Sequence, residues 1–140
     1  MDPNDKNVDL AIEPIWPDFS KVAAKTVPTE LFVTKEMIEK ERVNDTDEIV
    51  FAGMFAPYQG VRRNFPIVRH GKLAMISDEP IPWSDGVTED LYLADLMSFG
   101  GNSGSPVLLR LGGVSETGAI SGYRYVLLGV MQGITRPNHR

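Results

Sequence analysis

The chain has 140 residues, of which 42% are hydrophobic, 24% are charged and none is cysteine. Such a composition is typical of a globular protein, and the length predicts one domain that buries roughly 70% of its unfolded surface. The lack of cysteine excludes disulfides, a thiolate nucleophile and thiolate metal ligands. The formal net charge of −5 argues against nucleic-acid binding through general basicity. No stretch approaches the ~20 apolar residues of a membrane helix, and the polar start predicts no signal peptide.

Acidic residues are concentrated in the first third of the chain. Residues 1–50 contain 12 acidic and 6 basic residues, whereas residues 51–140 contain 7 and 8. A solvated surface with a linker is the ordinary explanation of such a charge run, and an acidic docking surface is the alternative.

The first part of the chain predicts one short strand, a linker and one helix. Residues 8–15 read VDLAIEPI and alternate in part, and the prolines at 14 and 17 predict that this strand ends there. Irregular structure is expected over 17–33. Thr34 is a suitable N-cap for a short helix near 34–42, where lysine, glutamate and methionine favour helix formation.

From residue 47 onward the pattern predicts β structure. Strands are expected at 48–55, 64–76, 91–99, 105–111 and 123–134, with Gly71 marking a bulge or a close backbone approach. Short strands separated by glycine-containing turns predict an all-β fold, an antiparallel barrel or sandwich.

The segment that carries chemistry is FGGNSGSP at 99–106, between two expected strands. Glycines at 101 and 104 allow backbone conformations that residues with a Cβ avoid. A turn of this kind can aim successive N–H groups at one point, as an oxyanion hole requires. The alternative is a tight glycine-rich hairpin loop in which the serine is incidental.

The string GNSGSP closely resembles the nucleophile loop of the chymotrypsin-like (trypsin-fold) serine peptidases, whose pattern is G-[DN]-S-G-[GS]-P. The resemblance implies that Ser103 is the nucleophile and that the backbone N–H groups of Gly101 and Ser103 form the oxyanion hole. Residues 8–11, VDLA, resemble the strand start that carries the family's catalytic aspartate, which would be Asp9. Residues 126–130, VLLGV, resemble the strand after the nucleophile. The chain looks most like the bacterial trypsin-like branch.

For the fold, the resemblance implies the second of two antiparallel Greek-key β-barrels. Residues 47–140 would be this C-terminal barrel with the nucleophile loop. Residues 1–46 would be the last strand of an otherwise absent first barrel, followed by the inter-barrel linker.

For the substrate cleft, the resemblance implies that Gln132 and Gly133 line it and that Met97, six positions before Ser103, lies at the base of the specificity pocket. A methionine there favours apolar or small side chains. Asn102 stands where zymogen-activated members have an aspartate, which argues against activation by a freed N-terminus.

The expected triad lacks its histidine. In this family the histidine precedes the aspartate, but none of the eight residues before Asp9 is histidine. His70 would give the order Asp–His–Ser, and we expect it instead to be a strand residue with a local role. His139 lies in a polar tail. The chain is therefore expected to lack the first barrel; a histidine from another chain and a catalytically inactive relative are the alternatives.

The resulting expectation is a trypsin-like serine endopeptidase domain that is not competent alone. The alternative is an inactive peptidase-like module that binds peptides or partner proteins in the same cleft, and a barrel used in assembly is the third. A peptide or protein is the expected partner, with no nucleic acid and no membrane. No cofactor is expected, and two histidines 69 positions apart predict no metal site. The sequence leaves the compartment open.

Overall fold

The computed structural model describes residues 12–23, 25–55, 57, 60–62, 65–82, 88–97, 101–113 and 122–133. Two helices, η1 (Thr29–Leu31) and α1 (Lys35–Glu41), precede the strands. The strands are β1 (Glu48–Met54), β2 (Pro66–Ile76), β3 (Ile81–Pro82), β4 (Thr88–Glu89), β5 (Tyr92–Leu96), β6 (Pro106–Leu111) and β7 (Arg124–Val130).

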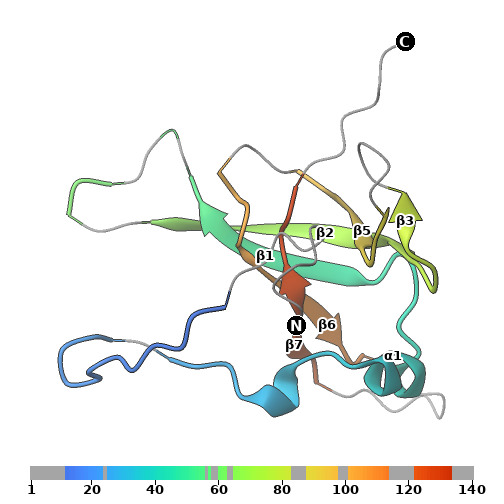
Figure 1. Ribbon diagram of the computed structural model, residues 1–140, viewed down its shortest axis with the longest axis horizontal. Coiled ribbons are helices and arrows are strands. Elements are labelled where there is room, and N and C mark those ends of the chain that lie inside the picture. The colour runs from blue at the N-terminus through green and yellow to red at the C-terminus, as the bar shows by residue number, and fades with distance from the viewer. Residues whose placement is uncertain are drawn as a thin grey trace.

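Five strands form one antiparallel sheet in the order β5-β2-β1-β6-β7, and β3 and β4 form a separate two-stranded ribbon. The long pair β1–β2 runs across Figure 1, and β6 and β7 cross it steeply, as expected for a strongly twisted sheet. The mostly β class, the short helix and the five main strands predicted from the sequence are therefore confirmed. The strand expected at 8–15 is not: residues 12–15 belong to no strand, and residues 8–11 lie outside the described part.

The sheet does not close into the expected barrel. Within the described residues β5 and β7 are the two edges and do not pair with each other. The outer edge of β7 instead meets the segment after η1, where Phe32 forms a parallel bridge with Leu127 and the Val33 N–H donates to the Leu127 carbonyl at 2.9 Å. This contact occupies part of the edge that a closing strand would need.

Alternation along β1 and β6 creates one buried face. Ile49 and Phe51 on β1 and Leu109 on β6 are each at most 1% exposed, and they share this face with Leu73 on β2 and Val126 on β7. Residues at η1 and α1, including Leu31, Val33, Met37 and Ile38, pack against the cluster. The core is thus one sheet face covered by the chain that leads into β1.

Helix α1 begins and ends at identifiable caps. The Thr34 hydroxyl accepts a hydrogen bond from the Met37 N–H at 3.2 Å, as an N-cap should. Arg42 adopts a left-handed conformation with φ of 53° and ends the helix. An ion pair of 2.8 Å between Glu41 and Arg124 joins the helix to β7.

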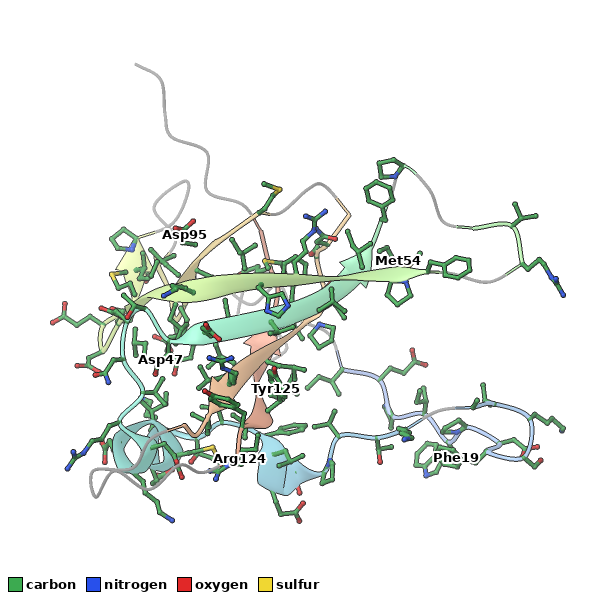
Figure 2. The ribbon with its side chains drawn as sticks, turned by 180° about the vertical axis from the view of Figure 1, so that it is seen from behind. Phe19, Asp47, Met54, Asp95, Arg124 and Tyr125 are labelled. Carbon is green, nitrogen blue, oxygen red and sulfur yellow. The ribbon has the colours of Figure 1, made fainter. Side chains whose placement is uncertain are left out.

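Residues 12–23 and 25–28, here called the strap, contain polar and apolar residues and lie apart from the core. Ile12, Ile15 and Trp16 are 80%, 74% and 87% exposed. Figure 2 shows Phe19 at its far end, away from the sheet. A turn closes there, because the Ser20 hydroxyl donates to Asp18 at 2.6 Å, and this hydrogen bond lowers the pKa of the Asp18 carboxyl. No helix in the described part of the chain is long and apolar enough to cross a membrane.

Gly71 permits the close approach of β2 to β5. It pairs with Leu96, and a Cβ at residue 71 would lie 2.5 Å from the Leu96 Cβ and 2.6 Å from the Asp95 carbonyl oxygen. The close approach expected from the sequence is therefore present, while the irregularity in this pair of strands falls between Leu73 and Met75.

We expect Gly71→Ala to lower the free energy of unfolding by roughly 1–3 kcal/mol, because the added methyl group cannot fit without separating the two backbones. Gly129→Ala is the matched control, since a Cβ there would meet nothing within 4 Å. Urea unfolding of both variants measures the difference. Equal losses would contradict the close approach.

Candidate active-site loop

The segment between β5 and β6 presents Ser103 at the tip of a tight turn. The Ser105 N–H donates to the Asn102 carbonyl at 3.1 Å, closing a four-residue turn over 102–105. Its third residue, Gly104, has φ of +79°, the position at which a type II turn requires a positive φ. Gly101, just before the turn, also has a positive φ, of 95°. The glycines singled out from the sequence are therefore required by the backbone.

Two backbone hydrogen bonds fix this turn, here called the serine loop (101–105), to the chain after β7. The Gly104 N–H donates to the Met131 carbonyl at 2.7 Å, and the Met131 N–H donates to the Ser105 carbonyl at 2.8 Å. The Ser103 hydroxyl donates to the Gln132 carbonyl at 3.1 Å. The structure therefore brings together Ser103 and Gln132, two of the residues predicted from the sequence.

The serine loop contains two buried polar residues. Asn102 and Ser105 are 2% and 9% exposed, whereas Gly101, Ser103 and Gly104 are exposed. The candidate nucleophile thus lies on the surface, beside polar side chains that are buried. Among the described residues, none accepts a hydrogen bond from the backbone N–H of Gly101 or Ser103.

A shallow cavity of about 290 Å³ opens beside Ser103. One wall is the end of β1 and the start of β2, and the other wall is the serine loop. Figure 2 shows Met54 at this end of β1, whereas Asp47 lies next to the other end of the strand. The lining residues are Ala52, Gly53, Met54, Pro66, Gly101, Ser103, Gly104, Ser105 and Pro106. None of these side chains is charged. A partner in this cavity would therefore meet mostly apolar side chains, exposed glycine backbone and serine hydroxyls.

The other predicted site residues lie in different places. Met97 directly follows β5, is 68% exposed and does not line the cavity. Gly133 ends the described segment after β7, beside Gln132. Asp9 and His139 lie outside the described residues, so their expected roles stay predictions.

His70 does not reach the serine loop through the sheet. It pairs with Val50 in the middle of β1, on the face opposite the core. Gly53, which contacts the loop, is three positions after Val50, about 10 Å along a strand. Among the described residues no group of three or more histidine, aspartate or glutamate side chains could hold a metal.

The sequence did not single out Gly53, Met54 or Pro66 as cavity residues. The glycine inside the expected strand 48–55 was a signal, because glycine in a strand interior often marks a close approach. The sequence does not say what approaches it. Comparisons of the chain with protein-family models, with curated proteins and with solved structures found no match.

We expect Gly104→Ala to destabilise the protein by roughly 1–2 kcal/mol through backbone strain alone, because a positive φ disfavours a Cβ. A Cβ there would meet nothing within 4 Å, so crowding does not contribute. Gly104→Asn is the matched variant and should cost less, since asparagine tolerates this conformation. Urea unfolding measures both, and equal losses would contradict the strain explanation.

Proposed function

We propose that this chain carries the nucleophile side of a chymotrypsin-like serine peptidase site that acts on peptides or proteins. The observation that carries the proposal is the serine loop. This loop holds the exposed Ser103 together with two positive-φ glycines, Gly101 and Gly104, and two buried polar residues, Asn102 and Ser105. In this proposal the antiparallel sheet β5-β2-β1-β6-β7 is an opened form of the expected second barrel, and the segment before β1 is the linker.

Each part of the loop has a role in acyl transfer. The Ser103 Oγ would attack the carbonyl carbon of a peptide bond, and its proton would pass to a base. The N–H groups of Gly101 and Ser103 would hold the negative oxygen that forms, the largest usual contribution to such a step. The protonated amine would then leave, and water would release the acyl group from Ser103.

The base must come from outside the described residues. The Ser103 hydroxyl now donates to the Gln132 carbonyl, which is no proton acceptor for catalysis. We propose that another polypeptide segment supplies an imidazole across the cavity between β1 and the serine loop, with Asp9 orienting it as the resemblance implies. Trp16 and Ile12 in the strap are 87% and 80% exposed, an apolar surface that such a neighbouring segment would cover in this proposal.

Substrate would lie along the segment after β7. Gln132 and Gly133 follow Met131, the first residue after the strand, and the Gln132 carbonyl lies 3.1 Å from the Ser103 hydroxyl. An extended peptide added at this edge would therefore place a carbonyl near the nucleophile. Met97 stays the proposed contact for the side chain before the scissile bond.

Labelling with a fluorophosphonate in the presence of added imidazole tests the nucleophile. The probe forms a bond from the Ser103 Oγ to phosphorus, fluoride leaves, and imidazole takes the proton. We expect labelling of the chain to rise roughly tenfold as imidazole is added, since a general base contributes on this scale or more. Mass spectrometry of the labelled peptide locates the serine.

Ser103→Ala should abolish this imidazole-dependent labelling. Ser20→Ala is the matched control, because Ser20 is exposed but lies in the strap. Labelling that survives in Ser103→Ala, or that imidazole does not increase, would contradict the proposed nucleophile.

A second candidate function is peptide binding without cleavage. The hydrogen bond from Ser103 to the Gln132 carbonyl favours it, because this arrangement leaves the hydroxyl protonated. Methyl NMR with labelled methionine tests the binding that both candidates require, and mass spectrometry of the peptide after incubation with added imidazole separates them, because binding alone leaves the peptide intact. Peptide binding should move the Met131 signal and leave that of Met37 in α1 unchanged, and Ser103→Ala should bind equally well. No shift at Met131 would contradict binding along this edge.

A further inference from the structure

The end of β1 makes an unusually close contact with the serine loop. Ile49, Phe51 and Gly53 alternate toward the buried face. A Cβ on residue 53 would lie 2.7 Å from Asn102 Oδ1, 3.3 Å from Asn102 Cγ and 2.9 Å from Ser105 Oγ. Real Cβ atoms do not approach other heavy atoms this closely, so the contact exists because residue 53 is glycine.

The strand register explains how these residues meet. Phe51 pairs with Val107 across β1 and β6. Continued by two residues, the same antiparallel register brings Gly53 opposite Ser105. The end of β1 therefore lies opposite the last residue of the serine loop, and the Asn102 carboxamide occupies the space next to the Gly53 Cα.

The Asn102 carboxamide cannot easily move away from this contact. Asn102 is 2% exposed and does not line the cavity, so a displaced carboxamide would have to enter packed protein, whereas the Ser105 residue borders the cavity. The Ser105 backbone is also bound twice, through its N–H to the Asn102 carbonyl and through its carbonyl to the Met131 N–H. A displacement of Asn102 would therefore also move the backbone of residues 102–105, which includes Ser103.

We propose that Gly53 is a positioning residue of the site. It acts through Asn102 and Ser105, and by leaving room for both it sets the direction of the Gly101 and Ser103 N–H groups and of the Ser103 hydroxyl. This role of Gly53 rests on the proposed function, because in that proposal these N–H groups bind the substrate carbonyl and the Ser103 hydroxyl attacks it. It adds that β1, a strand without a catalytic residue, determines their geometry.

Amide NMR and hydrogen exchange on the full chain test this proposal. We expect Gly53→Ala to shift the amide signals of Gly101, Ser103 and Gly104. It should also speed exchange of the Gly104 N–H by roughly tenfold, the equivalent of a modest overpacking penalty. Gly129→Ala, the control on β7 with open space at its Cβ, should change neither.

A double variant separates positioning from general destabilisation. Asn102→Ala removes two of the three atoms nearest the added methyl group and leaves only Ser105 Oγ, so Gly53→Ala should change Gly104 exchange clearly less in that background than in the natural chain. Equal effects of Gly53→Ala with and without Asn102 would overturn the proposal. If Gly53→Ala alone does not fold, we expect the double variant Gly53→Ala/Asn102→Ala to fold. The proposal would be overturned if Asn102→Ala folds but neither Gly53→Ala nor the double variant does.

The test does not depend on nucleophilicity. Exchange and amide shifts report loop geometry even where the fluorophosphonate leaves Ser103 unlabelled, so either proposal can fail alone. Where labelling does occur, Gly53→Ala should slow it and Gly129→Ala should not. Unchanged labelling together with shifted loop amides would show that the contact is structural only and would overturn the positioning role.

Discussion

The inward alternation of β1 is the constraint on which the rest of the structure depends. β1 pairs on one side with β2 and on the other with β6, so its buried face lies at the centre of the sheet. Ile49 and Phe51, each 1% exposed, build the core there, and Gly53 continues the same face to the serine loop. One strand thus connects the packing of the core with the position of the candidate nucleophile.

The β7 side completes the support of the loop. Met131 holds it through two backbone hydrogen bonds, so the loop lies between the end of β1 and the chain after β7. In this arrangement Ser103 is exposed while Asn102 and Ser105 are buried. Precise positioning of this kind relies on rigid elements around a short turn, and here both elements belong to one sheet.

Much of this fold could be predicted because its signals are local. Thr34 and the helix formers after it mark α1, and apolar runs bounded by glycine and proline mark the strands. Whether the sheet closes into a barrel could not be predicted. Pairing of the edge strands β5 and β7 depends on the twist of the sheet and on the competing contact of Phe32 with Leu127. For the same reason the turn glycines 101 and 104 could be found from the sequence, whereas the contact between Gly53 and Asn102 depends on strand register.

The hydrogen bond from Ser103 to the Gln132 carbonyl connects substrate binding with the nucleophile in the proposed site. A carbonyl oxygen has two lone pairs, so an incoming peptide N–H can share the Gln132 oxygen with the hydroxyl. Sharing weakens the oxygen's attraction for the serine proton. A peptide bound along 131–133 would then both present its carbonyl to the loop and loosen the hydroxyl for transfer to a base. Without such a base the same geometry holds the peptide and leaves the bond intact, so the supply of an imidazole decides between the two candidate functions.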